Sequence, residues 1–396
     1  MKKNRFFYFG MINTDALHKK LKEPIEIAAA SNKMISILNS IRLTQSRAFL
    51  VSAPVLGRNC RVKFMPGCVL RDNGVPQIIL PVFSNAYLRK IIAFFSFAWF
   101  CFKKVKSNDR VILFNHALEY LLGLLILTFK GNLVILDIED MPCDNTMGFL
   151  NWIDRKVFCL FYNLTAEKKI VVSSLLADRL KLKKFCVTYG AVRINEKIKF
   201  SNKFSTKAPL KILYGGTLIS DTGLDIFCDA VKLIANTLIL RDQKIHFVIT
   251  GFGGSLKINN LKNYCKGSRV RIIYSPSTSY DDYIHQLSLC DVGLSLKIPN
   301  REITLTTFPS KVVEITTNGL LLISTKASDV PKLFDSRTAI LLKEPTANCL
   351  HAAIISALRD KMGMKKIAMR GKNKAMKLFD PKIIGMQIIN FIEENN

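Results

Sequence analysis

The sequence lacks the features that mark secreted, metal-binding or low-complexity chains. Its ten cysteines are scattered singly, with no C-x-x-C pair and no histidine at ligand spacing, so we expect reduced thiols, no zinc site and a cytosolic protein. No tract rich in proline, serine or glycine appears, and no repeat of about 20 to 50 residues, which excludes solenoid and linker architectures. The first residues hold too short an apolar run for a signal peptide, so we expect no export.

Acidic residues are few. The chain has 30 Asp and Glu against 58 Lys and Arg, a formal net charge of +28 in 396 residues. Such a surplus attracts polyanions, that is anionic lipid headgroups, nucleotides or nucleic acid, although a solvated basic surface would give the same composition. Because no nucleic-acid-binding module and no basic stripe interleaved with aromatics is visible, no nucleic-acid partner is predicted.

The chain also lacks a hydrophobic run long enough to span a bilayer. The longest, Ile91 to Phe102, has twelve residues broken only by a serine, whereas a spanning helix needs about 20. It stands between Arg89-Lys90 and Lys103-Lys104, and its phenylalanines and tryptophan suit the headgroup region of a membrane. Two alternatives remain open, a buried core helix and a helix lying in the interface. The second predicts an anionic membrane surface as a partner and a location at the inner face of the cell membrane.

What the sequence does contain is a regular alternation of short apolar runs with longer helical stretches. This alternation predicts an α/β protein whose parallel sheets are covered by helices on both faces. It runs through residues 1–200 and starts afresh in 201–375, which predicts two Rossmann-like, doubly wound domains facing a cleft. The last segment, 376–396, is predicted as a helix that packs back on the first domain.

The stretch "TFPSKVVEITTNG" places charged residues at the start of a predicted helix. A helix that begins near Pro309 or Ser310 presents unpaired N–H groups and the positive end of its dipole, and Lys311 adds a full charge there. Glu314 lies one turn further on about the same face, where its carboxylate suits the hydroxyls of a sugar. A nucleotide offers both groups. The alternative is that Lys311 and Glu314 only form a surface ion pair.

Other polar or glycine-rich loops also follow predicted strands. Gly215, Gly216 and Thr217 end one apolar run, and Gly251 and Gly253 end another; each loop is equally consistent with a plain tight turn.

In the first domain His116 follows one strand, and Glu139 and Asp140 follow the next. An acceptor hydroxyl needs a base or an orienting group, which these residue types supply. Here too a structural role, such as helix capping by Asp140, is equally consistent with the sequence.

Residues 209 to 345 resemble the donor-nucleotide domain of GT-B glycosyltransferases of the family 4 type, most clearly at the block containing Pro309, Ser310, Lys311, Glu314 and Gly319. The resemblance implies that Glu314 holds the ribose of a nucleotide sugar and that Gly215, Gly216 and Thr217 face its diphosphate. It also implies that the loop near Tyr274 and Ser275 lies by the base. No metal and no cofactor beyond the nucleotide-sugar co-substrate are implied.

Two departures from the family pattern concern the donor site. Thr306 stands where many members have a second glutamate that contacts the donor sugar, and Thr217 and Thr222 stand where many have Arg and Lys. We expect Lys311, together with Arg301, to supply the missing positive charge.

The leading hypothesis is therefore a metal-independent, hexosyltransferase-like glycosyltransferase. Its acceptor is expected to be a lipid-linked glycan intermediate of bacterial surface polysaccharide synthesis, or another saccharide. A nucleotide-sugar hydrolase or epimerase of the same fold and a non-catalytic basic protein of the membrane surface are the alternatives.

Overall fold

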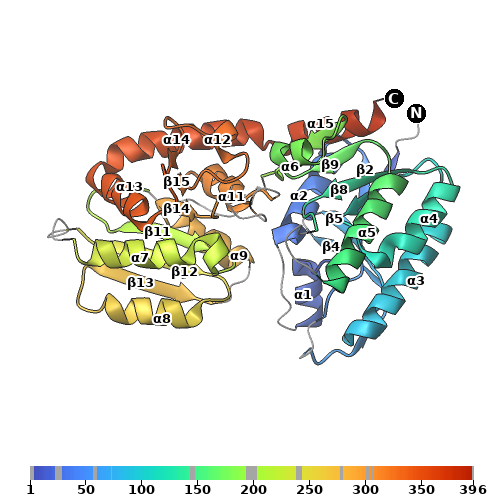
Figure 1. Ribbon diagram of the computed structural model, residues 1–396, viewed down its shortest axis with the longest axis horizontal. Helices are drawn as coiled ribbons and strands as arrows, with labels where there is room; N and C mark the ends of the chain where they lie inside the picture. Colours follow the sequence, from blue (N-terminus) through green and yellow to red (C-terminus); the bar gives the residue numbers. More distant parts are fainter. Residues whose placement is uncertain are drawn as a thin grey trace. The chain divides into compact units, whose positions relative to one another are not determined.

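The computed structural model describes residues 4–22, 29–56, 60–72, 74–142, 148–192, 203–237, 243–276, 280–299, 304 and 307–394. The chain divides into two compact units (Figure 1): unit 1 comprises Met1–Arg193 with Asp380–Asn396, and unit 2 comprises Ile194–Phe379. The division thus falls at residue 193, where the sequence suggested 200, and the terminal segment of unit 1 begins at 380, where the sequence suggested 376. Each unit is described by itself.

Unit 1 is built on an eight-stranded sheet in the order β10-β9-β8-β7-β1-β2-β5-β4. Its strands are β1 (Arg5–Gly10), β2 (Arg47–Ser52), β4 (Cys68–Asp72), β5 (Val75–Ile79), β7 (Arg110–Phe114), β8 (Leu133–Ile138), β9 (Lys169–Val171) and β10 (Phe185–Val187). The parallel pattern predicted from the sequence holds except at one edge, where β4 pairs antiparallel with β5. The two short strands β3 (Phe64–Met65) and β6 (Val82–Phe83) form a separate antiparallel pair.

Helices cover both faces of this sheet because β1 is apolar on both sides. Phe6 and Tyr8 point into a core shared with α2 (Ala29–Leu43) and α15 (Pro381–Glu393). Phe9, on the alternate side, stacks on Phe97 of α3 (Ala86–Lys104) with ring centroids 5.4 Å apart. The remaining helices are α1 (Asp15–Leu21), η1 (Leu118–Tyr120), α4 (Leu121–Phe129), α5 (Phe149–Leu164) and α6 (Ser174–Arg179).

Unit 2 has a six-stranded, wholly parallel sheet in the order β13-β12-β11-β14-β15-β16. Its strands are β11 (Leu210–Gly215), β12 (Ile245–Thr250), β13 (Val270–Ser275), β14 (Val292–Ser295), β15 (Leu321–Ser324) and β16 (Ile340–Leu341). The direction of winding reverses between β11 and β14, which makes the carboxyl ends of these two strands the topological switch point.

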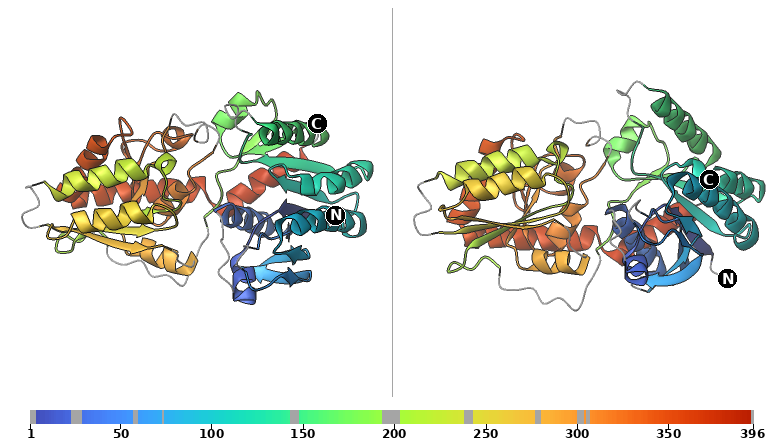
Figure 2. Two further views of the ribbon diagram at one scale, coloured as in Figure 1. Left: turned by 60° about the horizontal axis from the view of Figure 1, so that its bottom comes forward. Right: turned by 90° about the horizontal axis from the view of Figure 1, so that it is seen from below.

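Helices also lie on both faces of the unit 2 sheet (Figure 2). α7 (Leu224–Ala235) packs against α8 (Ser255–Tyr264) and α13 (Ala347–Arg359), and α11 (Lys311–Thr317) packs against α14 (Lys361–Leu378). The others are η2 (Ser220–Thr222), α9 (Tyr280–Ser288) and α12 (Val330–Leu333). The predicted doubly wound architecture is therefore present in this unit.

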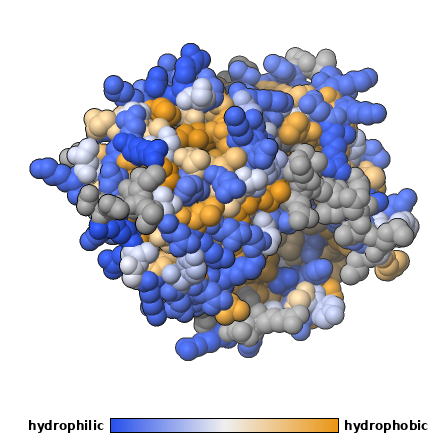
Figure 3. Space-filling view, turned by 60° about the vertical axis from the view of Figure 1, so that its left-hand side comes forward, coloured by the Kyte–Doolittle hydropathy of each residue, from blue (hydrophilic) through white to orange (hydrophobic). Residues whose placement is uncertain are grey.

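Some of the lysines bind carbonyl oxygens at the C-terminal ends of helices. Lys169 donates from Nζ to the carbonyl oxygen of Tyr162 at the end of α5. Lys203 donates from Nζ to the carbonyl oxygens of Ser288, the last residue of α9, and of Cys290, two residues further on. Burial lowers the pKa of each of these two lysines to about 8. Other hydrophilic side chains, drawn in blue, are widespread on the face that Figure 3 presents, with hydrophobic ones between them.

Candidate functional site

The candidate site of unit 2 lies at the switch point of its sheet. Gly215 ends β11 and Gly216 follows it, while α11 begins after the segment that leaves β14. In doubly wound sheets, ligands bind outside the carboxyl ends of the strands at this position. The topology therefore brings together the glycine loop and the "PSK" block, which lie about 95 residues apart in the sequence.

The two glycine loops touch each other, and only glycine fits there. Gly216 has a φ of +116° and Gly251 a φ of +125°, and a Cβ on Gly251 would lie 1.8 Å from the carbonyl oxygen of Gly216. The N–H of Gly216 donates to the carbonyl oxygen of Thr250, and the N–H of Gly251 donates to that of Ser275. These amides are thus engaged inside the unit, and they hold the ends of β11, β12 and β13 together.

Lys311 and Glu314 meet beside the first glycine loop. Lys311 Nζ donates to Glu314 Oε2 at 2.8 Å, and the hydroxyl of Tyr283, from α9, donates to the same oxygen at 2.9 Å. Lys311 Nζ also lies 4.1 Å from the centroid of the Tyr283 ring, a cation–π contact. A Cβ on Gly216 would be 3.7 Å from Lys311 Cε, so the lysine stem lies against the loop. The side chains of Lys311 and Glu314 stay partly accessible to solvent, at 27% and 18%.

The start of α11 differs in detail from the sequence-based expectation. The helix begins at Lys311, and the N–H groups of Val312 and Val313 already donate to the carbonyl oxygens of Pro309 and Ser310. These two amides are therefore paired, whereas the sequence suggested a row of unpaired N–H groups. The charge at this helix start comes mainly from the Lys311 ammonium group.

The other predicted residues of unit 2 lie in the loop after β11, at the end of β13 and in the second glycine loop. Thr217 is exposed in the loop after Gly216, and its carbonyl oxygen accepts from the Thr222 hydroxyl. Tyr274 and Ser275 end the edge strand β13, where Tyr274 lines a groove of about 520 Å³. Gly253 adopts a φ of +87° and approaches the backbone of Leu218. Arg301 and Thr306 lie outside the described residues.

In unit 1, His116 is held by a partner that the sequence did not indicate. It follows β7, the strand next to the switch point between β1 and β7. Its Nε2 lies 2.9 Å from Oδ1 of Asp154 on α5, and its ring packs edge-on against Phe158 with centroids 5.2 Å apart. A carboxylate in this position orients an imidazole.

Glu139, which follows β8, takes part in an ion pair, while Asp140 lies exposed beside it. Glu139 pairs with Lys33 of α2, a side chain that is almost fully buried. Burial lowers the pKa of Lys33, against the carboxylates of Asp137 and Asp140, which act to raise it. Next to this pair the hydroxyl of Tyr8 donates to Asp137, and burial followed by the charge of Asp137 raises the pKa of Tyr8 well above its ordinary value.

The structure thus assembles Gly215, Gly216, Gly251, Lys311 and Glu314 in unit 2. His116, Glu139 and Asp140 lie at the carboxyl ends of neighbouring strands of unit 1, β7 and β8. Tyr283 and Asp154 were missed because each lies on an amphipathic helix, where its residue type follows from packing alone. Within the described ranges, no group of three or more His, Cys, Asp or Glu side chains is placed to hold a metal ion; the metal independence of the protein stays a prediction.

Comparison with known proteins identifies a family for this part of the chain. Residues 195–375 match the family model described as glycosyl transferases group 1. This part of the chain belongs to that family. The matched range covers every residue of the unit 2 cluster, from Gly215 to Glu314, and the family predicted from the "PSK" block is confirmed.

Solved structures extend the likeness over the whole chain. Sucrose-phosphate synthase from Thermosynechococcus elongatus matches with a TM-score of 0.67 and 11% identity over 98% of each chain. HepE from Anabaena, solved with UDP and glucose, matches with a TM-score of 0.66 and 14% identity over 98% of each chain. A glycosyltransferase from Rickettsia africae matches with a TM-score of 0.64 and 13% identity over 100% of each chain. A search of curated proteins finds no match. The fold is therefore that of the GT-B glycosyltransferases, with two Rossmann-like domains, as predicted.

Proposed function

We propose that the protein transfers a sugar from a nucleotide-sugar donor, bound by unit 2, to an acceptor hydroxyl. The observation that carries this proposal is the cluster of Lys311, Glu314 and Tyr283 against Gly216 at the switch point. It sets a cation suited to the diphosphate and a carboxylate suited to the ribose side by side at the end of the sheet. The Lys311–Glu314 pair is then the resting arrangement of the site, and a bound nucleotide separates the two charges.

In the transfer step the bond between the anomeric carbon and the diphosphate oxygen breaks, and a bond from the acceptor oxygen forms. Negative charge grows on the departing diphosphate, so Lys311 stabilises the transition state more than the bound donor. The glycine loops let the diphosphate approach the backbone, although the amides of Gly216 and Gly251 are already used. Lys311 is therefore the main electrostatic group, and Glu314 with Tyr283 orients the ribose.

The acceptor hydroxyl loses a proton in this step, and His116 is the base we assign to it. Asp154 holds the imidazole through its Nε2 atom at 2.9 Å, so the other ring nitrogen, Nδ1, is the one that takes the proton. Asp140, exposed beside Glu139, is a second group that orients the acceptor. Glu139 is engaged with Lys33 and supports the loop that carries Asp140.

We further propose that the donor is a UDP-sugar, because HepE, a structure of the same fold, is solved with UDP and glucose. The acceptor is a lipid-linked glycan intermediate of bacterial surface polysaccharide synthesis, at the inner face of the cell membrane. The basic and aromatic helix α3 supports this location. No metal and no further cofactor enter the reaction.

The direct test is thermal stabilisation by nucleotides. A ligand that binds only the folded state raises its stability, by about 2.7 kcal/mol at one hundred times its dissociation constant. We expect stabilisation by UDP, with GDP and TDP as the comparison set, and its loss in Lys311→Ala. The control Lys366→Ala removes an exposed lysine of the same unit. If no nucleotide stabilises the wild-type protein, the donor site is refuted.

Product analysis separates transfer from hydrolysis or epimerisation. The protein is incubated with UDP-[14C]glucose, with and without a lipid extract of bacterial membranes. Transfer places label in the lipid fraction only when the extract is present. Release of free glucose, or of an epimer, at the same rate in both mixtures would assign the protein to the alternative reactions.

A further inference from the structure

Helix α3 has one buried side and one exposed apolar side. Ala93, Phe97 and Cys101 are buried, and the backbone of Phe97 and the sulfur of Cys101 lie against Gly123 of α4. The opposite side exposes six large apolar residues: Tyr87, Leu88, Ile91, Phe95, Trp99 and Phe102. The sequence left two alternatives for this helix, a core helix and a helix lying in the membrane interface. α3 has the buried side of a core helix and also the exposed apolar side that an interfacial helix requires.

The neighbouring helices continue this surface. α4 packs against both α3 and α5, and the three lie side by side in Figure 1. Phe129 at the end of α4 is 91% exposed. At the start of α5, Phe149 and Trp152 stack on each other with centroids 6.1 Å apart, and both are exposed. The chain has two tryptophans, Trp99 and Trp152, and both lie on these helices. We call the exposed apolar residues of the three helices the α3–α5 surface.

Cations are interleaved with the exposed rings. Lys103 Nζ lies 5.2 Å from the ring centroids of both Trp99 and Phe102, and Lys156 Nζ lies 5.7 Å from that of Trp152. α3 carries Arg89, Lys90 and Lys104 as well, and no acidic residue. On the neighbouring helices Glu119 is buried and Asp154 is paired with His116. On α3 and α5 the cations outnumber the acids among the described residues, so the α3–α5 surface combines apolar rings with positive charge.

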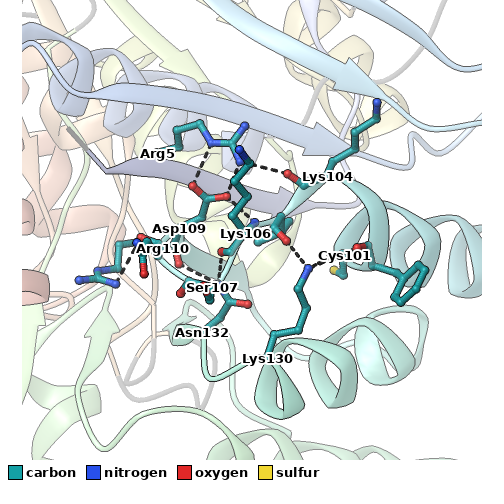
Figure 4. Close-up of polar contacts among 12 residues, drawn as sticks. Arg5, Cys101, Lys104, Lys106, Ser107, Asp109, Arg110, Lys130 and Asn132 are labelled. Carbon is teal, nitrogen blue, oxygen red and sulfur yellow. Dashed lines mark hydrogen bonds and ion pairs between the residues drawn. The ribbon is translucent and has the colours of Figure 1, made fainter. Parts of the chain in front are cut away.

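Polar contacts fix the end of α3 in place (Figure 4). Lys130, which follows α4, donates from Nζ to the carbonyl oxygens of Cys101, Phe102 and Val105, and so satisfies the last turn of α3. The Asn132 side chain donates to carbonyl oxygens of the turn after the helix, and Arg5 of β1 binds Asp109 of the same turn at 2.6 Å. The aromatic side chains thus project from a rigid base.

A large exposed apolar patch on a rigid scaffold marks a binding surface. We propose that the α3–α5 surface docks unit 1 on an anionic lipid bilayer, with its rings in the headgroup–acyl boundary and its lysines at the lipid phosphates. A second copy of the chain is the competing occupant. It is disfavoured because two such surfaces face to face would set Lys103, Lys156 and Arg89 against their own copies, with no acid on α3 to offset them.

Docking on a membrane surface differs from spanning the bilayer. Across the described residues, no helix has both the length and the apolar content needed to cross a bilayer. The 19 residues of α3 are basic at both ends, and one side of the helix belongs to the core of unit 1. The helix therefore lies along the membrane surface. This inference deepens the lipid-linked acceptor of the proposed function by naming the surface that reaches the membrane.

The test uses the whole protein with lipid vesicles and needs neither donor nor acceptor. Vesicles of phosphatidylcholine alone are compared with vesicles containing about one third phosphatidylglycerol. We expect co-sedimentation and a blue shift of tryptophan fluorescence with the anionic vesicles only, weakened by salt. No binding to anionic vesicles would overturn the inference. It would leave the nucleotide assignment untouched, because nucleotide stabilisation is measured without lipid.

Variants locate the contact. Ile91→Ser with Phe95→Ser keeps both tryptophans as reporters and should weaken vesicle binding at least tenfold, as should Lys103→Glu with Lys104→Glu. The matched control, Leu256→Ser with Met362→Ser, removes two exposed apolar residues of unit 2 and should bind as the wild type does. Equal losses of vesicle binding in the test and control variants would overturn the inference. So would a concentration-dependent dimer that the Ile91 and Phe95 changes abolish, since a second copy would then be the occupant.

Discussion

Lys311 Nζ and Glu314 Oε2 lie 2.8 Å apart, one turn apart on α11, with the Tyr283 hydroxyl on the same oxygen. An ion pair at this spacing on a helix surface stabilises the helix by only about 0.2–0.5 kcal/mol, and this pair is partly accessible to solvent. The ion pair that the sequence left open as the alternative is present in the structure. It does not exclude the functional interpretation, because a weak pair is easily separated by a ligand.

We predict that changes at Lys311 and Glu314 affect different parts of a nucleotide. Lys311→Ala should weaken UDP binding at least tenfold while leaving the weak binding of uridine unchanged, because uridine has no phosphate. Glu314→Gln should weaken both, since both carry the ribose. Isothermal titration with UDP and uridine measures this. Both melting temperatures should stay within about 3 °C of the wild type, and an equal effect of Lys311→Ala on the two ligands would contradict the assignment.

The buried pair of Lys33 and Glu139 is predicted to matter for stability. Lys33→Met leaves the Glu139 carboxylate without its partner, so it should lower the free energy of unfolding by about 3–5 kcal/mol. Glu139→Gln should also destabilise the protein, but by less, because Asp137 and Asp140 still face Lys33. The double variant should lose clearly less than the sum of the two, because neither charge is then left alone. Urea unfolding of the four proteins measures the coupling. Additive losses would show that the two side chains act independently.

The contact between the two glycine loops gives a third prediction. Gly251→Ala would place a Cβ 1.8 Å from the Gly216 carbonyl oxygen, so the loops must separate and nucleotide stabilisation should disappear. Gly267 has a similar positive φ of +81°, but a Cβ there would meet no atom within 4 Å, so Gly267→Ala should cost only about 1 kcal/mol. Thermal unfolding with and without UDP compares the two. Full UDP binding by Gly251→Ala would contradict the role of the loop contact.

Lys203 is predicted to make stability depend on pH. Burial lowers its pKa to about 8 in the folded protein, whereas an unfolded lysine titrates near about 10.4. Between these values the unfolded state binds the extra proton, so the free energy of unfolding rises with pH through this window. Relative to Lys203→Met, the wild type should therefore be more stable at about pH 9.5 than at about pH 7.5. Urea unfolding at both pH values measures this, with Lys366→Met as control; a constant difference would refute it.

The strands of both units were predictable because they are buried on both faces. Runs such as "LKILY" and "HFVIT" are mostly apolar and do not alternate strictly with polar residues, as expected of parallel central strands. Helix α13 is readable from the sequence, because Thr346 caps its start and its apolar face is periodic. The antiparallel edge was missed, although the Asn73-Gly74 pair between β4 and β5 is a hairpin signal.

Helix α14 shows why some elements escaped the sequence. Its sequence is lysine-rich and contains two glycines. Besides Lys361 at its start, the residues it buries are small: Ala368, Gly371 and Ala375. A Cβ on Gly371 would lie 2.4 Å from the Thr338 carbonyl oxygen, so close packing of backbones replaces an apolar stripe. In the site, the Lys311–Glu314 spacing was readable from helix geometry. The Tyr283 contact joins residues 31 positions apart, which only the fold brings together.

The return of the chain to unit 1 has a consequence for how the protein is made. α15 packs against α2 so tightly that a Cβ on Gly385 would lie 2.0 Å from the Ser40 carbonyl oxygen, and its Ile388 belongs to the same core as Phe6 and Tyr8. During synthesis the ribosome delivers all of unit 2 before this helix. Unit 1, whose synthesis begins first, is therefore completed last. A nascent chain that stops before residue 380 lacks α15 and leaves the core of unit 1 accessible to chaperones.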